Sequence, residues 1–190
     1  MPTPRPHLTR RHALLALAWA CTTPTTAMST AMTTAMPAEV SFGLKQAQLQ
    51  GRANLRYFGF LLYEAHLWTP PGFDAQRYDA HPFALELEYA RKLDGSAIAE
   101  RSIAEMKRVG DFSEAQSKAW LALMMQAFPN VGAQDRLTGL HDGKGGVRFF
   151  FNGKQTAAIN DKDYARLFFG IWLSTKTTAP GLRAELIGQG

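Results

Sequence analysis

Two arginines lie inside one of the most apolar stretches of this 190-residue chain, which reads LQGRANLRYFGFLLYEAHLW at 49–68. A guanidinium group in a dry cleft can pair with a carboxylate or a phenolate through two charge-assisted hydrogen bonds. Arg56 is the leading candidate for such a pairing, because the polar residues before it give way to Phe58 and Phe60. The alternative is that Arg52 and Arg56 belong to a solvated strand face, and the sequence leaves both interpretations open.

Three further side chains could share a ligand with this arginine. Tyr57 and Tyr63 lie in the same stretch, and Glu105 lies in a predicted helix. We predict Arg56, Tyr57, Tyr63 and Glu105 as ligand-binding residues, a set that rests on the family resemblance described below, and assign none of them a catalytic role. The alternative is a proton-transfer set drawn from Tyr57, Tyr63 and Glu105, because phenols and carboxylates that face one small molecule can exchange protons with it.

The sequence predicts no cofactor and no metal. It contains no dinucleotide fingerprint, no GxSxG elbow and no HExxH motif. The glycine-rich segment 142–146 joins two predicted strands, whereas a phosphate-binding loop joins a strand to a helix. His66, His81 and His141 have no metal-site spacing, and the chain's one cysteine, Cys21, precedes the predicted domain.

Composition indicates one globular domain with little excess charge. Hydrophobic residues make up 46% of the chain and aromatic residues 11%. The net charge of +5 falls to +2 after residue 38, because Arg5, Arg10 and Arg11 come before every acidic residue. Nucleic acid is therefore not an expected partner, since no basic run with interleaved aromatics remains.

Residues 1–38 have the pattern of an export signal and a low-complexity tether, which leaves 39–190 as the folded domain. Arg10 and Arg11 precede an apolar run at 13–21 that is too short for a bilayer span, which needs about 20 residues. We therefore expect a periplasmic protein with no integral membrane span in the mature chain. The paired arginines are typical of a twin-arginine signal, and the general secretory route is the alternative. Lipidation of Cys21 is less favoured, because its neighbours fit the lipoprotein pattern badly.

Alternation with a period of two predicts strands. In 83–90, Phe83, Leu85, Leu87 and Tyr89 share one face, and Glu86 and Glu88 share the other. Gly59 interrupts another alternating stretch and predicts a bulge or bend. Asn152-Gly153 predicts a tight hairpin. The predicted strands are 52–57, 60–68, 83–90, 135–142, 146–151 and 154–159.

Helices are predicted between and after these strands. Asp94 or Ser96 caps a helix to about Val109, and Ser113 with Gln116 forms a capping box for a helix that ends before Pro129. Asn160 is the predicted cap of an apolar helix to about 173, and a short helix follows Pro180. The order of elements predicts an α+β fold, a mostly antiparallel sheet covered by a layer of helices.

In order and spacing, the chain from Leu49 to Leu186 resembles the bacterial exported branch of the chalcone isomerase-like family. The resemblance implies an open-faced sandwich, with a ligand cleft between the sheet and its helices. The matching features are G-x-x-x-L-R-x-x-G-F-x-x-Y-x-A-x-L from Gly51 to Leu67, LEYARKL at 87–93, Trp120 with FPNV at 128–131, FFFNG at 149–153, and IND at 159–161 before FFGIWL at 168–173.

The resemblance implies two possible activities. Plant enzymes of the family close a chalcone into a flavanone with an arginine, a threonine, a tyrosine and an asparagine, whereas other members bind fatty acids and use the arginine for the carboxylate. This chain has Phe58 at the threonine position, Ile98 at the tyrosine position and Glu105 at the asparagine position. The arginine is retained, and its candidates are Arg56, Arg52 and Lys45.

The sequence therefore favours a non-catalytic, exported binder of a small hydrophobic or amphipathic ligand with an acidic head, such as a fatty acid or a phenolic. The alternative is an intramolecular lyase or isomerase of the chalcone isomerase kind. A further alternative is a partner-binding domain of an envelope complex, for which the sequence offers no direct sign.

Export can be tested with a reporter fused to residues 1–38. We expect cell fractionation to find this reporter in the periplasm, because a basic head and a short apolar run direct export. Replacing Arg10 and Arg11 with lysines should block export only if the twin-arginine route is used. Retention of the unmodified fusion in the cytoplasm would contradict the predicted signal.

Overall fold

The computed structural model describes residues 1–2 and 35–189, and its compact unit begins at Ala35. This start lies slightly before the predicted boundary at residue 39. Most of the predicted export signal and tether, including Cys21, lies outside the described residues. Within the part of the chain that is described, no helix is both long and apolar enough to cross a bilayer.

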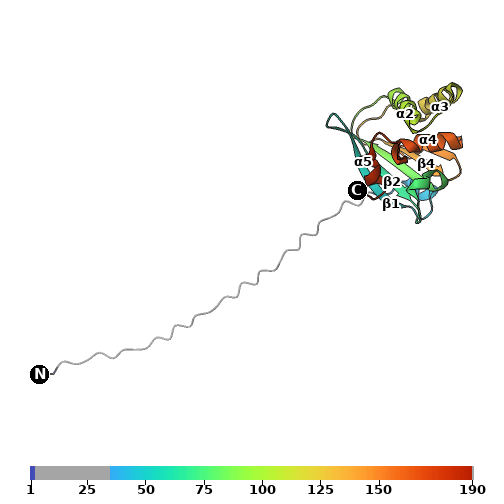
Figure 1. Ribbon diagram of the computed structural model, residues 1–190. Helices are drawn as coiled ribbons and strands as arrows, with labels where there is room; N and C mark the ends of the chain where they lie inside the picture. Colours follow the sequence, from blue (N-terminus) through green and yellow to red (C-terminus); the bar gives the residue numbers. More distant parts are fainter. Residues whose placement is uncertain (3–34, 190) are drawn as a thin grey trace. The chain divides into compact units, whose positions relative to one another are not determined.

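Six strands form one antiparallel sheet in which each strand pairs with the next along the chain. Figure 1 shows this sheet with helices packed against it. A short helical segment, η1 (Ala75–Ala80), joins the second strand to the third. The predicted α+β class and antiparallel sheet are confirmed. The strands are β1 (Gln48–Tyr57), β2 (Phe60–Thr69), β3 (Pro82–Tyr89), β4 (Arg136–Asp142), β5 (Gly146–Phe151) and β6 (Lys154–Asn160).

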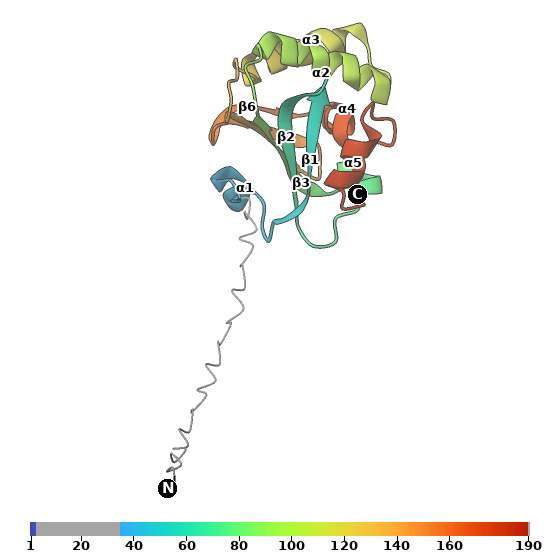
Figure 2. The ribbon, with the colours of Figure 1, turned by 90° about the vertical axis from the view of Figure 1, so that its left-hand side faces the viewer.

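Four of the helices lie over the sheet face that carries the predicted apolar residues. They are α2 (Gly95–Val109), α3 (Glu114–Ala127), α4 (Lys162–Leu173) and α5 (Pro180–Leu186). Helix α2 packs against both α3 and α4, and α5 packs against β1. A short helix that the sequence reasoning missed, α1 (Ala38–Gly43), lies on the opposite side of the sheet from α4 and α5 (Figure 2).

The helix starts follow the predicted caps with two differences. Ser113 and Gln116 form the predicted capping box at the start of α3. The predicted cap of α4 is wrong: Asn160 is still paired within β6, and Asp161 caps the helix by accepting a hydrogen bond from Tyr164 N at 3.1 Å. At α2, Asp94 is the cap residue, but its side chain makes no capping hydrogen bond. The first amide of the helix, Gly95 N, donates instead to Asn130 Oδ1 at 3.0 Å.

Glu86 lies on the face opposite the apolar residues of β3, as predicted, but it is buried there because α1 covers part of that face. Val40 of α1 belongs to a second apolar cluster with Trp68 of β2, and only 2% of the surface of Glu86 remains exposed. The buried carboxylate accepts a hydrogen bond from Trp68 Nε1 at 3.0 Å and lies 3.7 Å from Arg136 Nη1. Buried charge is tolerated when it is paired in this way.

The sequence interpretation of Gly59 also requires correction. Phe58 and Gly59 have φ angles of +47° and +81° and form the two-residue turn between β1 and β2, so Gly59 does not interrupt a continuing strand. Phe58 therefore does not continue the face that carries Arg56. The register of this hairpin shifts within the strands instead, near Gly51 of β1 and near Leu62 of β2.

Gly51 brings α5 into direct contact with β1. A Cβ atom at this position would collide with the backbone carbonyl oxygens of Glu185 and Leu186. A hydrogen bond stabilises this close approach: Gln50 Nε2 donates to Ile187 O at 3.2 Å. The absence of a side chain at Gly51 thus allows the last helix to lie against the edge of the sheet.

We expect Gly51→Ala to lower the free energy of unfolding by about 1–3 kcal/mol, because the added methyl group must push α5 away from β1. Urea denaturation measures this change. Gly181→Ala is the matched control, since a Cβ atom there meets nothing within 4 Å, and it should not lower stability. Equal stability of the Gly51→Ala variant and the parent would show that α5 does not depend on this contact.

Candidate functional site

A largely apolar cavity of about 520 Å³ lies between the sheet and the helices. This volume is within the range of about 300–1,000 Å³ that small-molecule sites occupy. Inward-facing residues of the strands form one wall, and α2, α4 and the segment from Thr178 to Leu182 form the other. The lining residues Arg56, Tyr57 and Arg101 are also exposed, so we define the mouth of the cavity by these three side chains.

All four residues predicted from the sequence line this one cavity. The two other candidates for the arginine position do not: Arg52 lines a separate pocket with Glu64, and Lys45 lines neither. Arg52 and Arg56 are both exposed, and of the two it is Arg56 that lines this cavity. The four residues brought together are Arg56, Tyr57, Tyr63 and Glu105.

A bulge in the β1–β2 hairpin explains why Arg56 and Arg52 lie in different pockets. Leu55 pairs with Tyr63, but Arg56 pairs with Leu61, which leaves Leu62 as the extra residue. Bulges of this kind twist the ladder and change the direction of neighbouring side chains. Arg56 Nη1 also donates to Gly59 O at 3.2 Å, which holds the guanidinium close to the hairpin turn.

Glu105 forms the polar centre of the α2 wall. Only 7% of its surface is exposed, and its Oε2 accepts a hydrogen bond from Thr178 Oγ1 at 2.9 Å. Its Oε1 lies 2.6 Å from Arg101 Nη2, in an ion pair whose geometry is not that of a hydrogen bond. Arg108 Nε is a more distant partner at 3.9 Å. The carboxylate is thus held by three side chains.

Arg101 is a cavity residue that the sequence reasoning missed. It lies four residues before Glu105 on α2, and this spacing alone could have identified the pair. Its side chain is 70% exposed, so the guanidinium reaches both Glu105 and the solvent at the mouth. Arg56 belongs to the same lining, so two arginines and one carboxylate line the cavity.

Tyr63 is held as a neutral phenol. Burial raises the pKa of its hydroxyl to about 12, and the nearby Glu105 acts in the same direction, although Trp172 and Arg101 oppose it. Trp172 Nε1 donates to Tyr63 Oη at 3.0 Å. The phenolic proton is not used in that bond and can be donated to a ligand oxygen.

The remaining sequence candidates lie in different places. Ile98, which aligns with the family's tyrosine, lines the cavity, whereas Phe58, which aligns with the threonine, lies outside its wall and is 84% exposed. His66 lies on the other face of the sheet, where it contacts Glu64 and Glu86. Among residues 35–189, no group of histidine, aspartate and glutamate side chains is placed to hold a metal ion.

Comparison with known proteins agrees with this architecture. A solved structure with a similar fold is a fatty-acid binding protein of Arabidopsis thaliana, with a TM-score of 0.59 and 8% sequence identity over 75% of this chain and 87% of that chain. At this identity the similarity shows a shared fold alone. No curated protein matches the sequence. A sequence model described as chalcone isomerase-like matches residues 28–188, which is most of the chain. The protein therefore belongs to the chalcone isomerase-like family.

Proposed function

We propose that this domain binds a small amphipathic molecule with an apolar tail and an acidic head, such as a fatty acid or a phenolic, and does not convert it. One observation carries the proposal: a 520 Å³ cavity with mostly apolar walls has two arginines, Arg56 and Arg101, in its lining. A fatty-acid binding protein with the same fold supports it.

The charges at the mouth favour an anionic head. A guanidinium presents five N–H donors and suits two-point pairing with a carboxylate. Arg101 directs one terminal nitrogen toward Glu105, so its other donors remain available to a ligand. Tyr63 lines the same cavity, and its neutral phenol is a further donor for an acidic head group.

The apolar walls of the cavity favour a ligand with an apolar tail. The walls behind the mouth are built from leucine and aromatic side chains of the sheet and of α4. Burial of apolar ligand surface against them contributes about 25 cal/mol per Å². The residues of the deep wall include Leu85, Leu87, Tyr89, Phe149, Phe168 and Trp172.

The same geometry disfavours the isomerase alternative. A general acid or base works best when its pKa lies near the working pH. The pKa of Tyr63 is raised to about 12, so its phenol stays protonated at neutral pH. The carboxylate of Glu105 is engaged by Arg101 and Thr178. These contacts position a ligand and do not favour removal of a proton from it.

We infer further that the protein is exported and works in the periplasm. The support is the sequence pattern of residues 1–38, with Arg10 and Arg11 before the apolar run at 13–21. The reporter fusion described above tests this location independently of ligand binding.

We expect Arg56→Met to weaken the binding of a long-chain carboxylate by about 1.5–3 kcal/mol, the range for hydrogen bonds to charged groups. Methionine keeps the packing of the arginine stem while removing its charge. The methyl ester of the same acid should bind the parent protein almost as weakly, because it offers no charge to pair. Isothermal titration calorimetry measures all three affinities.

Arg52→Met is the matched control, because Arg52 is an exposed arginine of the same strand that lies outside the cavity lining. It should change the affinity by no more than about 0.5 kcal/mol. Equal binding of acid and ester by the parent protein would show that no arginine pairs with the ligand's carboxylate, whatever the variants do.

A further inference from the structure

Three large aromatic side chains are exposed together at the tip of the β1–β2 hairpin. Tyr57 is 63% exposed, Phe58 is 84% exposed and Phe60 is 63% exposed. The hairpin projects from the body of the domain at the left of Figure 1. Clustered exposed apolar residues mark an interaction surface, whereas single ones need no explanation. We define these three residues as the aromatic tip.

The turn itself does not explain the aromatic residue at its first position. A two-residue turn with two positive φ angles favours Asn-Gly, because bulky residues are strained there. The β5–β6 hairpin uses that pair, Asn152-Gly153, with φ angles of +49° and +82°. Phe58-Gly59 adopts nearly the same angles, +47° and +81°. A phenylalanine kept at a strained position points to a role in binding rather than in folding.

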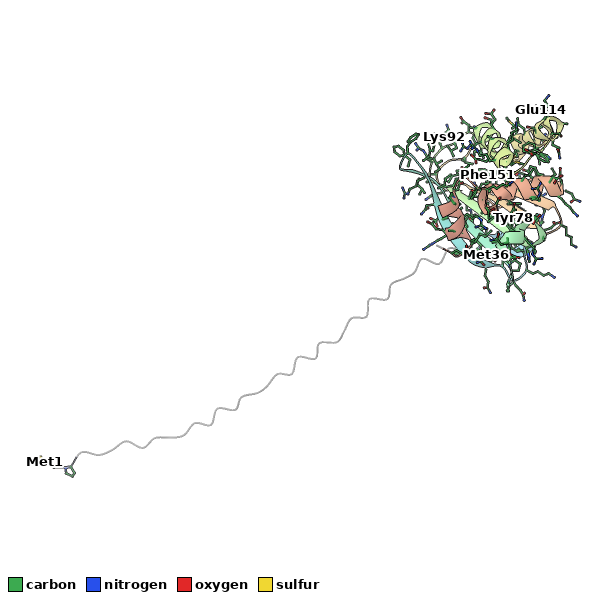
Figure 3. All side chains as sticks on the ribbon, viewed as in Figure 1. Met1, Met36, Tyr78, Lys92, Glu114 and Phe151 are labelled. Atoms are coloured by element: carbon green, nitrogen blue, oxygen red, sulfur yellow. The ribbon has the colours of Figure 1, made fainter. Side chains whose placement is uncertain are left out.

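Basic residues lie beside the aromatic tip. The guanidinium of Arg91 lies over the ring of Phe60, 5.2 Å from its centre, and Lys92 follows it in the chain. Figure 3 shows Lys92 on the side of the domain from which the hairpin projects, with Glu114 toward the other end. The segments 55–62 and 89–93 carry Arg56, Arg91 and Lys92 and no acidic residue; the nearest in sequence are Glu64, Glu88 and Asp94.

We propose that the aromatic tip and its basic neighbours dock the domain on an anionic lipid bilayer, with the mouth of the cavity at the membrane surface. Aromatic rings favour the interface between lipid and water, and each basic residue near an anionic surface adds to the attraction. The tip is a narrow projection rather than a hollow, which suits shallow insertion between lipid headgroups better than a protein partner.

Docking deepens the proposed function, because Arg56 and Tyr57 belong both to the hairpin and to the cavity lining. An amphipathic acid leaving the bilayer would reach the mouth without crossing bulk water. The membrane contact itself rests on the exposed residues of the tip and does not require that the cavity be filled.

Sedimentation of the full chain with phosphatidylcholine vesicles, with and without phosphatidylglycerol, measures the docking. Phe58→Asn restores the preferred turn sequence, so it should keep the fold while lowering the partition coefficient on anionic vesicles about tenfold or more. Arg91→Gln with Lys92→Gln should lower it about 30-fold on anionic vesicles and little on neutral ones. Circular dichroism checks that each variant is folded.

Two control variants match these changes at other sites. Phe42→Ser removes a 90% exposed aromatic residue from α1, which lies outside the hairpin. Lys118→Gln with Lys144→Gln removes two exposed positive charges from α3 and from the β4–β5 turn. Each control should change the partition coefficient by less than about twofold, since neither touches the aromatic tip or its basic neighbours.

A fluorophore at the tip separates this contact from binding by the apolar N-terminal segment. In a Cys21→Ser background, Phe58→Cys carries a nitrobenzoxadiazole label, and Phe42→Cys carries it in the control. Anionic vesicles should raise and blue-shift the emission at position 58 and leave it unchanged at position 42. A label at position 58 that stays in water with every vesicle, or equal losses for Phe58→Asn and Phe42→Ser, would overturn the proposal and favour a protein partner.

The vesicle experiments contain no added fatty acid, and calorimetry of acid binding contains no vesicles. A chain that binds the acid but not the vesicles would refute docking alone. A chain that docks but binds no acid would refute the cavity function alone.

Discussion

The buried carboxylate of Glu105 constrains the whole cavity wall. A charged group with 7% of its surface exposed must be paired, because desolvation of an unpaired carboxylate costs several kcal/mol. Arg101 lies one turn earlier on α2, and Thr178 lies in the segment before α5. The contacts of Glu105 therefore position both Arg101 at the mouth of the cavity and the segment around Thr178 that lines its side.

Polar contacts join the helices to the sheet and to one another. Trp172 Nε1 donates to Tyr63, which joins α4 to β2, and Trp120 Nε1 donates to Asp161 at 3.0 Å, which joins α3 to the start of α4. Protein interiors are normally packed to the density of organic crystals. The apolar cavity of about 520 Å³ departs from that density, and it is the space in which we propose that the ligand binds.

Local patterns were sufficient to predict most of the fold from the sequence. The strand predicted at 83–90, the capping box of Ser113 and the Asn152-Gly153 turn each depend on neighbouring residues, and each was confirmed. Helix α1 was missed, because its packing against Trp68 and Leu140 is a tertiary contact. The Phe58-Gly59 turn was read as a bulge or bend, because phenylalanine is not a usual turn residue.

The candidate site, too, was predictable only where local sequence was enough. Arg56, Tyr57, Tyr63 and Glu105 were chosen from one sequence stretch and a family resemblance, and they line one cavity. Arg101 was missed although its spacing from Glu105 was visible, because only the folded chain shows that the pair faces the cavity. The bulge that separates Arg56 from Arg52 leaves no clear mark in the sequence.

Native mass spectrometry of the gently purified protein tests the central claim most directly. The account predicts that the chain carries one small amphipathic acid, identifiable after denaturation, or takes up one added long-chain acid per chain. Ile98→Trp, which places a larger side chain in the cavity lining, should reduce this occupancy while keeping the fold. A chain that is empty as purified, and that stays empty with excess acid, would contradict the account.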